Sequence, residues 1–135
     1  KNQEAFKKLE IYRAPNILIV QLKRFDCKTE NIYEGWIKNK KNDSLVIFPL
    51  KDLDIGKYVV EENSRKDCLY DLCAISQHYG GLSSGHYTAY CLNEGEWYNF
   101  DDEKVSKISD IKKVVSDGAY ILIFRKKSLG GIKKD

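Results

Sequence analysis

The chain has 135 residues, 42% hydrophobic and 32% charged, and this length and composition fit one folded domain. No apolar run approaches the ~20 residues that span a bilayer, and the first residues, KNQEAFKKLE, lack a signal-peptide pattern, so we expect no membrane segment. The net charge of +3 is too small to indicate a nucleic-acid partner.

The first half of the chain predicts two strands separated by a long polar segment. Residues 16–25, NILIVQLKRF, begin as an apolar run after Pro15 and then alternate, which predicts a mostly buried strand. Residues 26–44 are polar with scattered aromatics and are expected to form a long loop or a loose hairpin. Residues 45–50, LVIFPL, predict a short strand that ends at Pro49.

The second half predicts further strands and one short helix. Alternation and apolar runs predict strands at 70–79, 86–92, 97–101 and 119–127. Ser109 is the expected N-cap of a short helix that Asp117-Gly118 closes, with Ile111, Val114 and Val115 on one apolar face. Many strands and little helix predict an α+β domain with a mostly antiparallel sheet over residues 1–127, followed by a flexible tail at 128–135.

Four cysteines, Cys27, Cys68, Cys73 and Cys91, include no C-x-x-C pair. We therefore expect no zinc site built from this chain alone. Without a secretion signal, reduced thiols in a cytoplasmic or nuclear protein are favoured over disulfides, and buried packing is the default role of each cysteine.

The segment GGLSSGHYTAYCLNEGEWYNFDDEKV predicts a hairpin that carries a histidine and two aspartates. Its NEGE turn fits a four-residue loop around a type I turn, which pairs Leu92 with Trp97. Side chains on one face of a strand repeat every two residues. His86 and Asp101 then share a face as diagonal neighbours, and Asp102 points to the other face.

The histidine beside a carboxylate has two interpretations. A carboxylate can hold the ring of His86 in one tautomer and stabilise its protonated form, which leaves the other nitrogen free to act as a general base. The alternative is a surface or structural pair. The glycines Gly80, Gly81 and Gly85 remove side chains where another backbone could approach closely, and a flexible turn explains them equally well.

A general base needs a nucleophile, and none is evident in this sequence. Cys91 lies five residues from His86 on the same predicted strand and therefore points to the opposite face. Cys68 and Cys73 have no histidine or helix N-terminus beside them to activate the thiol. The sequence thus predicts a base and its orienting residue without their partner.

The segment YDLCAISQHYGGLSSGHYTAYCLNEGEWYNFDDEKV resembles the histidine-containing signature of the ubiquitin-specific proteases. APNILIVQLKRF resembles the strand of that family that ends in L-K-R-F, and AYILIFRKK resembles its closing strand. The likeness runs from residue 3 to residue 127. It implies a papain-like cysteine protease fold and hydrolysis after the C-terminal glycine of ubiquitin, without a cofactor or a metal.

The resemblance also implies a role for single residues. His86 matches the catalytic histidine, Asp101 the residue that orients it, and Asp102 a second acidic position that supports the site. The loop at 80–85 is implied to close over the Gly-Gly tail of the substrate, and segment 26–44 to border the same channel. The implied substrate-binding residues are His78, Tyr79, Gly80, Gly81, Gly85 and Tyr87.

Nothing in the chain resembles the family's N-terminal box with the nucleophilic cysteine. The resemblance therefore implies the C-terminal half of a catalytic domain, inactive by itself. Its implied partners are the missing N-terminal half, ubiquitin and ubiquitinated proteins. The competing hypotheses are a non-catalytic ubiquitin-binding scaffold that keeps the protease fold, and a structural domain without ubiquitin contact.

Overall fold

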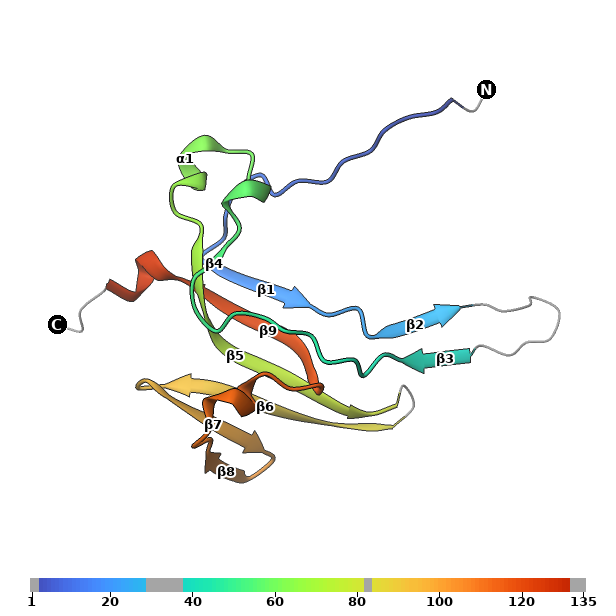
Figure 1. The fold of residues 1–135 in the computed structure, drawn as a ribbon, viewed down its shortest axis with the longest axis vertical. Coiled ribbons are helices and arrows are strands. Elements are labelled where there is room, and N and C mark those ends of the chain that lie inside the picture. The colour runs from blue at the N-terminus through green and yellow to red at the C-terminus, as the bar shows by residue number, and fades with distance from the viewer. Residues whose placement is uncertain (1–2, 29–37, 82–83, 132–135) are drawn as a thin grey trace.

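The fold is built around one antiparallel sheet (Figure 1). The computed structural model describes residues 3–28, 38–81 and 84–131. Within these residues seven strands form the sheet, in the order β1-β9-β5-β6-β7-β8 with β4 beside β5. Their bounds are Ile17–Gln21 for β1, Leu53–Asp54 for β4, Leu69–Gly80 for β5, Gly85–Asn93 for β6, Glu96–Asp101 for β7, Lys104–Lys107 for β8 and Ala119–Lys126 for β9.

Shorter elements surround this sheet. β2 (Phe25–Lys28) and β3 (Lys38–Lys41) pair with each other and extend from one end of the sheet (Figure 1). The helices of the described residues are α1 (Glu62–Arg65) and three 3-10 helices, η1 (Gly56–Tyr58), η2 (Ile111–Val114) and η3 (Lys127–Gly131). None of these helices is long and apolar enough to cross a membrane.

The hydrophobic core lies on one face of the sheet. β5 contributes Tyr70, Leu72 and Ile75, and the neighbouring strand β9 contributes Leu122 and Phe124, all of them buried. A register shift after Leu72 changes the alternation of β5, which is why Ile75 continues the buried row. Each of these side chains contributes roughly 1.5–3 kcal/mol by leaving water.

The predicted strands 70–79, 86–92, 97–101 and 119–127 are confirmed as β5, β6, β7 and β9. Together with the single short α-helix of the described part, they confirm an α+β fold with a mostly antiparallel sheet.

Three predictions about local structure are wrong. Residues 45–50 form no strand, and only Phe48 of that apolar run is buried. The strand predicted over 16–25 divides, because β1 ends at Gln21 and β2 begins at Phe25. The predicted helix is the 3-10 helix η2, and its N-cap is Asp110, whose side chain accepts a hydrogen bond from the Lys112 N–H at 3.0 Å.

β6 and β7 are joined by a two-residue turn, which corrects the predicted four-residue loop. Only Glu94 and Gly95 remain unpaired, with φ angles of 50° and 84°. Two consecutive positive φ angles characterise the type I′ turn, whose twist matches that of a hairpin. The predicted register is nevertheless confirmed, because Leu92 pairs with Trp97.

The segment predicted as a flexible tail, 128–135, begins inside η3. Ser128 Oγ donates a hydrogen bond to Asp67 Oδ2 at 2.8 Å, and Lys127 forms an ion pair with Asp52. These contacts hold the start of the predicted tail against the domain at Ser128. Residues 132–135 lie outside the described part.

Candidate active site

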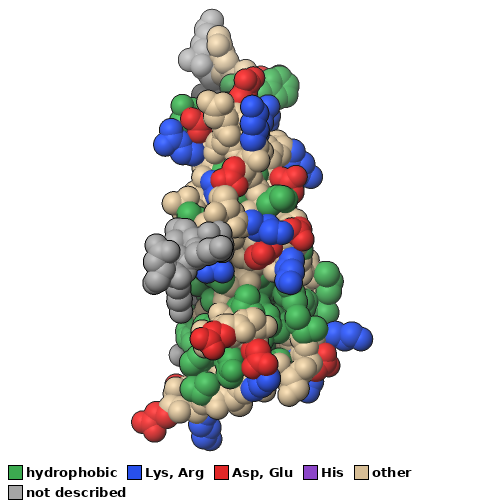
Figure 2. Space-filling view, turned by 90° about the vertical axis from the view of Figure 1, so that its left-hand side faces the viewer, with side chains coloured by type: hydrophobic (Ala, Val, Ile, Leu, Met, Phe, Trp, Pro, Cys, Tyr) green, Lys and Arg blue, Asp and Glu red, His purple; other side chains and the backbone are tan. Residues whose placement is uncertain are grey.

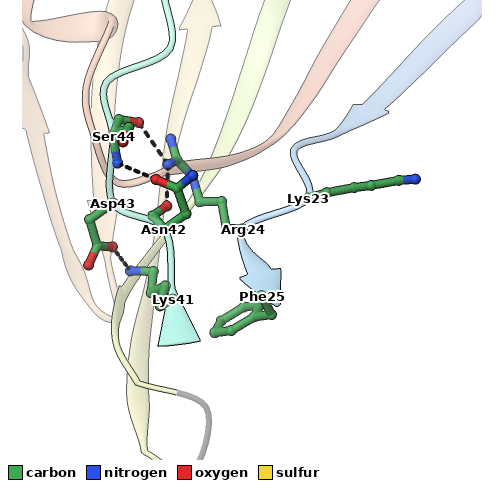
Figure 3. Close-up of a pocket in the computed structure, with 7 residues that line it drawn as sticks. All are labelled: Lys23, Arg24, Phe25, Lys41, Asn42, Asp43 and Ser44. Carbon is green, nitrogen blue, oxygen red and sulfur yellow. Dashed lines mark hydrogen bonds and ion pairs between the residues drawn. The ribbon is translucent and has the colours of Figure 1, made fainter. Parts of the chain in front are cut away.

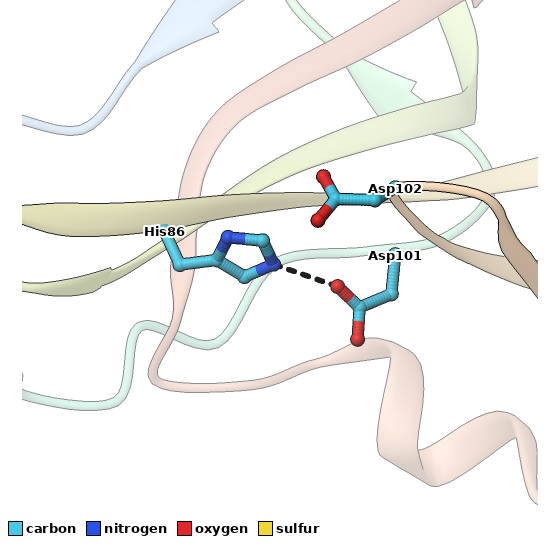
Figure 4. A group of neighbouring side chains, drawn as sticks. All are labelled: His86, Asp101 and Asp102. Carbon is cyan, nitrogen blue, oxygen red and sulfur yellow. Dashed lines mark hydrogen bonds and ion pairs between the residues drawn. The ribbon is translucent and has the colours of Figure 1, made fainter.

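His86 and Asp101 form the centre of the candidate site. His86 lies near the start of β6, Asp101 ends β7, and a hydrogen bond joins His86 Nε2 to Asp101 Oδ1 at 2.6 Å (Figure 4). The predicted approach of these two side chains is confirmed. They are 51% and 44% exposed, so burial does not fix either one. The hydrogen bond to Asp101 raises the pKa of His86, and it leaves Nδ1 as the nitrogen available to take a proton.

Asp102 lies beside the same histidine, which corrects its predicted position on the other face. β7 ends at Asp101, and Asp102 occupies the turn before β8 with a φ of 51°. Strand alternation stops there, and the ligand atoms of His86, Asp101 and Asp102 all lie within 4.8 Å of one another (Figure 4). The charge of Asp102 adds to the raised pKa of His86. These three side chains are close enough to ligate a metal ion. The hydrogen bond between His86 and Asp101, however, already engages His86 Nε2 and Asp101 Oδ1.

Two of the predicted loop glycines are required by close packing. A Cβ on Gly80, whose φ is 97°, would lie 2.7 Å from the carbonyl oxygen of Ser84. A Cβ on Gly85 would lie 2.3 Å from His78 Nε2. Any larger residue at these two positions would displace the loop. Gly81 has no such neighbour within 4 Å, so packing does not require glycine there.

The other predicted substrate-binding residues divide between the two faces of the sheet. Tyr79 is the cross-strand partner of His86 and therefore shares its face. His78 and Tyr87 are partners on the opposite face, with ring centroids 4.7 Å apart. His78 is only 4% exposed, and this burial lowers its pKa. The structure thus does not bring His78 to His86 and Asp101.

The β2–β3 pair contacts the main sheet at His78. The Phe25 ring lies 5.5 Å from the His78 ring, and Lys41 Nζ donates a hydrogen bond to the His78 carbonyl at 2.8 Å. A hollow between β3 and the glycine loop is lined by Lys41, Asp43, Tyr79, Gly80, Gly81, Asp117 and Gly118. The predicted channel-bordering segments reach this hollow, although their residues 29–37 and 82–83 lie outside the described part.

Arg24 is a structural residue of this region that the sequence pattern did not reveal. It is 3% exposed, and its guanidinium donates to the carbonyl oxygen of Ala119 at 2.5 Å. It also donates to the carbonyl oxygens of Asn42 at 2.8 Å and Ser44 at 2.9 Å (Figure 3). The interruption of strand alternation at this position is the one signal in the sequence. Nothing in the sequence around Lys41 indicates its hydrogen bond to the His78 carbonyl.

The cysteines with described side chains do not approach His86. Cys68 and Cys73 donate hydrogen bonds to backbone carbonyls, and Cys91 lies five residues further along β6. Burial raises the pKa of all three thiols, which is the opposite of what activates a nucleophile. The side chain of Cys27 is not among those described.

Comparison with known proteins identifies relatives over nearly the whole chain. The ubiquitin carboxyl-terminal hydrolase family model matches residues 2–124. Ubiquitin carboxyl-terminal hydrolase 5 of Arabidopsis thaliana is 42% identical over 135 residues, which cover 98% of this chain and 14% of that protein. Ubiquitin carboxyl-terminal hydrolase 15 of Homo sapiens is 41% identical over 128 residues, which cover 93% of this chain and 12% of that protein. The chain therefore spans at most 14% of the length of these two curated relatives.

Solved structures share the fold. A structure of the yeast SAGA DUBm has a TM-score of 0.75 and 31% identity, over 93% of this chain and 28% of that chain. The SAGA Ubp8/Sgf11/Sus1/Sgf73 DUB module bound to ubiquitin aldehyde has a TM-score of 0.68 and 26% identity, over 91% of this chain and 30% of that chain. Because the family match covers most of the sequence and the papain-like α+β fold agrees, the chain belongs to the ubiquitin carboxyl-terminal hydrolase family.

Proposed function

We propose that the whole protein is a thiol-dependent deubiquitinase that hydrolyses the bond after the C-terminal glycine of ubiquitin, with His86 as its general base. The observation that carries this proposal is the 2.6 Å contact between His86 Nε2 and Asp101 Oδ1. That contact orients the ring and keeps Nδ1 available for proton transfer. Family membership, and a related module bound to ubiquitin aldehyde, support ubiquitin as the substrate.

Each residue of the pair has a role in the proposed reaction. His86 Nδ1 takes the proton of a cysteine thiol, and the thiolate attacks the carbonyl carbon of the terminal glycine. The amine leaves with the proton from His86, and a thioester remains. The same nitrogen then deprotonates a water molecule, which hydrolyses the thioester and releases the thiol. Asp101 orients the ring throughout, and the charge of Asp102 adds to the stabilisation of the imidazolium.

The proposed nucleophile comes from a part of the protein outside this chain. Two observations on Cys68, Cys73 and Cys91 support this view. Burial raises the pKa of each thiol, and none of the three cysteines lies beside His86 in the sheet. Ubiquitinated proteins are the proposed substrates. These three cysteines are free thiols, which supports a reducing compartment, the cytoplasm or the nucleus, as the proposed location.

Substitution of His86 in the full-length protein tests the proposal. His86→Ala should lower turnover of a ubiquitin conjugate by at least ~10³-fold and leave ubiquitin binding nearly unchanged, because it removes the base but little contact surface. Glu96→Gln is the matched control. The ion pair between Lys107 Nζ and Glu96 Oε1 also measures 2.6 Å, on neighbouring strands and with similar exposure.

The control variant should keep wild-type turnover. Comparable turnover by His86→Ala would overturn the proposal. Ubiquitin binding without turnover by the wild-type protein would favour the non-catalytic scaffold instead.

A further inference from the structure

Three polar side chains form a hydrogen-bonded group on the His86 face of the sheet. They are Gln77, Tyr79 and Ser116, and we call them the tyrosine clamp. The Tyr79 hydroxyl donates to Gln77 Oε1, and Ser116 Oγ donates to the same oxygen at 3.2 Å. Gln77 is fully buried, and burial raises the pKa of Tyr79 to about 12, so its hydroxyl stays protonated at neutral pH. A single buried amide oxygen thus anchors both hydroxyls.

The backbone beside the clamp leaves room for the Tyr79 ring. A Cβ on Gly118 would lie 2.8 Å from ring atoms Cε1 and Cζ of Tyr79 and 2.9 Å from Gln77 Oε1. The φ of Gly118 is not left-handed, so contact with the clamp, and not backbone conformation, excludes a side chain there. The His78 N–H donates to the Gly118 carbonyl at 2.8 Å, which holds this turn against β5. The ring is therefore confined at its edge and at its hydroxyl.

Tyr79 lies directly opposite the proposed general base on the neighbouring strand. Tyr79 and His86 are Cα partners across β5 and β6, and such partners typically have Cβ atoms ~4.5–5.5 Å apart on one face. His86 is half-exposed, and Asp101 is its hydrogen-bond partner among the described side chains. A half-exposed side chain with one hydrogen bond retains freedom about χ1, and a fixed neighbour reduces that freedom.

We infer that Tyr79 is a positioning residue for His86. The clamp fixes the Tyr79 side chain on the β5 side of His86, which leaves the imidazole the orientation toward Asp101, in which Nδ1 meets the thiol of the nucleophile. This inference rests on the proposed function and extends it. Family resemblance implies substrate contact for Tyr79, whereas the clamp gives its hydroxyl a separate role that acts through His86.

Tyr79→Phe in the full-length enzyme isolates this role, because it removes the hydroxyl and keeps the ring. We expect kcat for a ubiquitin conjugate to fall roughly tenfold while KM stays within about twofold. The acidic limb of the kcat–pH profile should move to lower pH, because a less firmly held His86 loses part of the hydrogen bond that raises its pKa. A mere loss of folded protein would scale the profile without moving it.

Two further variants complete the experiment. Tyr98→Phe is the matched control, because the Tyr98 hydroxyl also donates to the residue two positions earlier, Glu96, at 3.2 Å. It should leave kcat unchanged. Ser116→Ala removes the second hydroxyl from Gln77 and should lower kcat less than Tyr79→Phe does. In the variant that combines Tyr79→Phe with Ser116→Ala, kcat should fall by less than the product of the two single effects. The reason is that both hydroxyls share one acceptor.

The outcomes separate this inference from the proposed function. Wild-type kcat and an unmoved acidic limb in Tyr79→Phe would overturn the inference alone. A raised KM with unchanged kcat would also overturn it and would assign the hydroxyl to substrate binding. Absence of turnover by the wild-type protein would overturn the proposed function, and the inference with it.

Discussion

The backbone, rather than burial, holds the candidate catalytic side chains in place. His86 and Asp101 are half-exposed, and their contact follows from the register of β6 against β7. This contact is predictable from the sequence, because residues two apart share a face. The position of Asp102 is not predictable in that way, because its positive φ of 51° takes it out of strand geometry.

The two aspartates should contribute unequally to turnover. Asp101→Asn should lower kcat/KM by roughly 10²-fold, because it removes the carboxylate that holds the His86 ring. Asp102→Asn should cost less than about tenfold, because Asp102 acts on His86 through its charge. Asparagine keeps the shape of both side chains and tolerates a positive φ, so the turn should survive. A larger loss of kcat/KM in Asp102→Asn than in Asp101→Asn would assign the orientation of His86 to Asp102 instead.

The two histidines of the chain should titrate on opposite sides of the ordinary value of ~6.5. The hydrogen bond to Asp101 raises the pKa of His86, whereas burial, followed by the charge of Lys41, lowers that of His78. The His86 pair therefore stabilises the fold at low pH, and its contribution is lost as the pH rises through the folded pKa. Burial of His78 acts in the opposite sense, because the folded state resists protonation as the pH falls below ~6.5.

NMR of the imidazole ring protons measures both titrations. With only two histidines in the chain, His86→Gln assigns the signals. Equal midpoints, or midpoints in the reverse order, would contradict the electrostatic account of both sites.

At the scale of elements, regular alternation made most of the sheet predictable. Buried positions largely alternate with less buried ones along β5 and β9, whereas the burial of β6 does not alternate, although its sequence does. The run at 45–50 misled the prediction because its apolar residues resemble a strand. In the structure the run lies beside β5, where the Leu72 N–H donates to Leu50 O at 2.9 Å. This contact occupies the short stretch of that edge between the pairing of Tyr70 with β4 and the pairing of β6, which begins at Ala74, so there is no room for a full strand.

Arg24, between β1 and β2, connects to the first residue of β9 and to the segment that follows β3. Arg24→Lys should destabilise the fold by about 2–4 kcal/mol, because a lysine cannot reach the carbonyls of Ala119, Asn42 and Ser44 at once and leaves buried acceptors unpaired. Arg125→Lys, at an exposed position of β9, is the control and should change stability by less than about 0.5 kcal/mol. Urea unfolding measures both. Equal effects of the two variants would show that the Arg24 hydrogen bonds contribute little.

At the scale of the whole molecule, several large hydrophobic side chains lie exposed on the surface. Ile17 and Ile19 on β1, and Phe100 and Val105 on β7 and β8, are exposed. Figure 2 shows hydrophobic side chains gathered over the lower part of one face of the molecule. Exposed apolar patches commonly mark contacts with other protein parts. They accord with the proposal that this chain, which spans at most 14% of the two compared relatives, works within a larger protein.

The last prediction follows from the proposal that the nucleophile lies outside this chain. The 135-residue chain alone should neither hydrolyse ubiquitin conjugates nor form a covalent adduct with a thiol-reactive ubiquitin probe. Hydrolysis needs a thiol within hydrogen-bond reach of His86, ~2.6–3.2 Å, and the described thiols of Cys68, Cys73 and Cys91 lie elsewhere in the sheet and its flanks. Hydrolysis also needs hydrogen-bond donors that stabilise the oxyanion, and we expect these donors to lie with the nucleophile outside this chain. Loss of one such donor typically lowers the rate ~10²–10³-fold.

Adding the N-terminal half of the proposed catalytic domain, in cis or as a separate chain, should restore cleavage only when its nucleophilic cysteine is intact. Mass spectrometry of the probe reaction, with and without that half, measures the adduct directly. The matched control is the added half with its cysteine replaced by alanine, which supplies the same contact surface without the thiol. An adduct on any of the four cysteines of the isolated chain, lost on His86→Ala, would show that the site is complete here. The nucleophile would then have to be sought within these 135 residues.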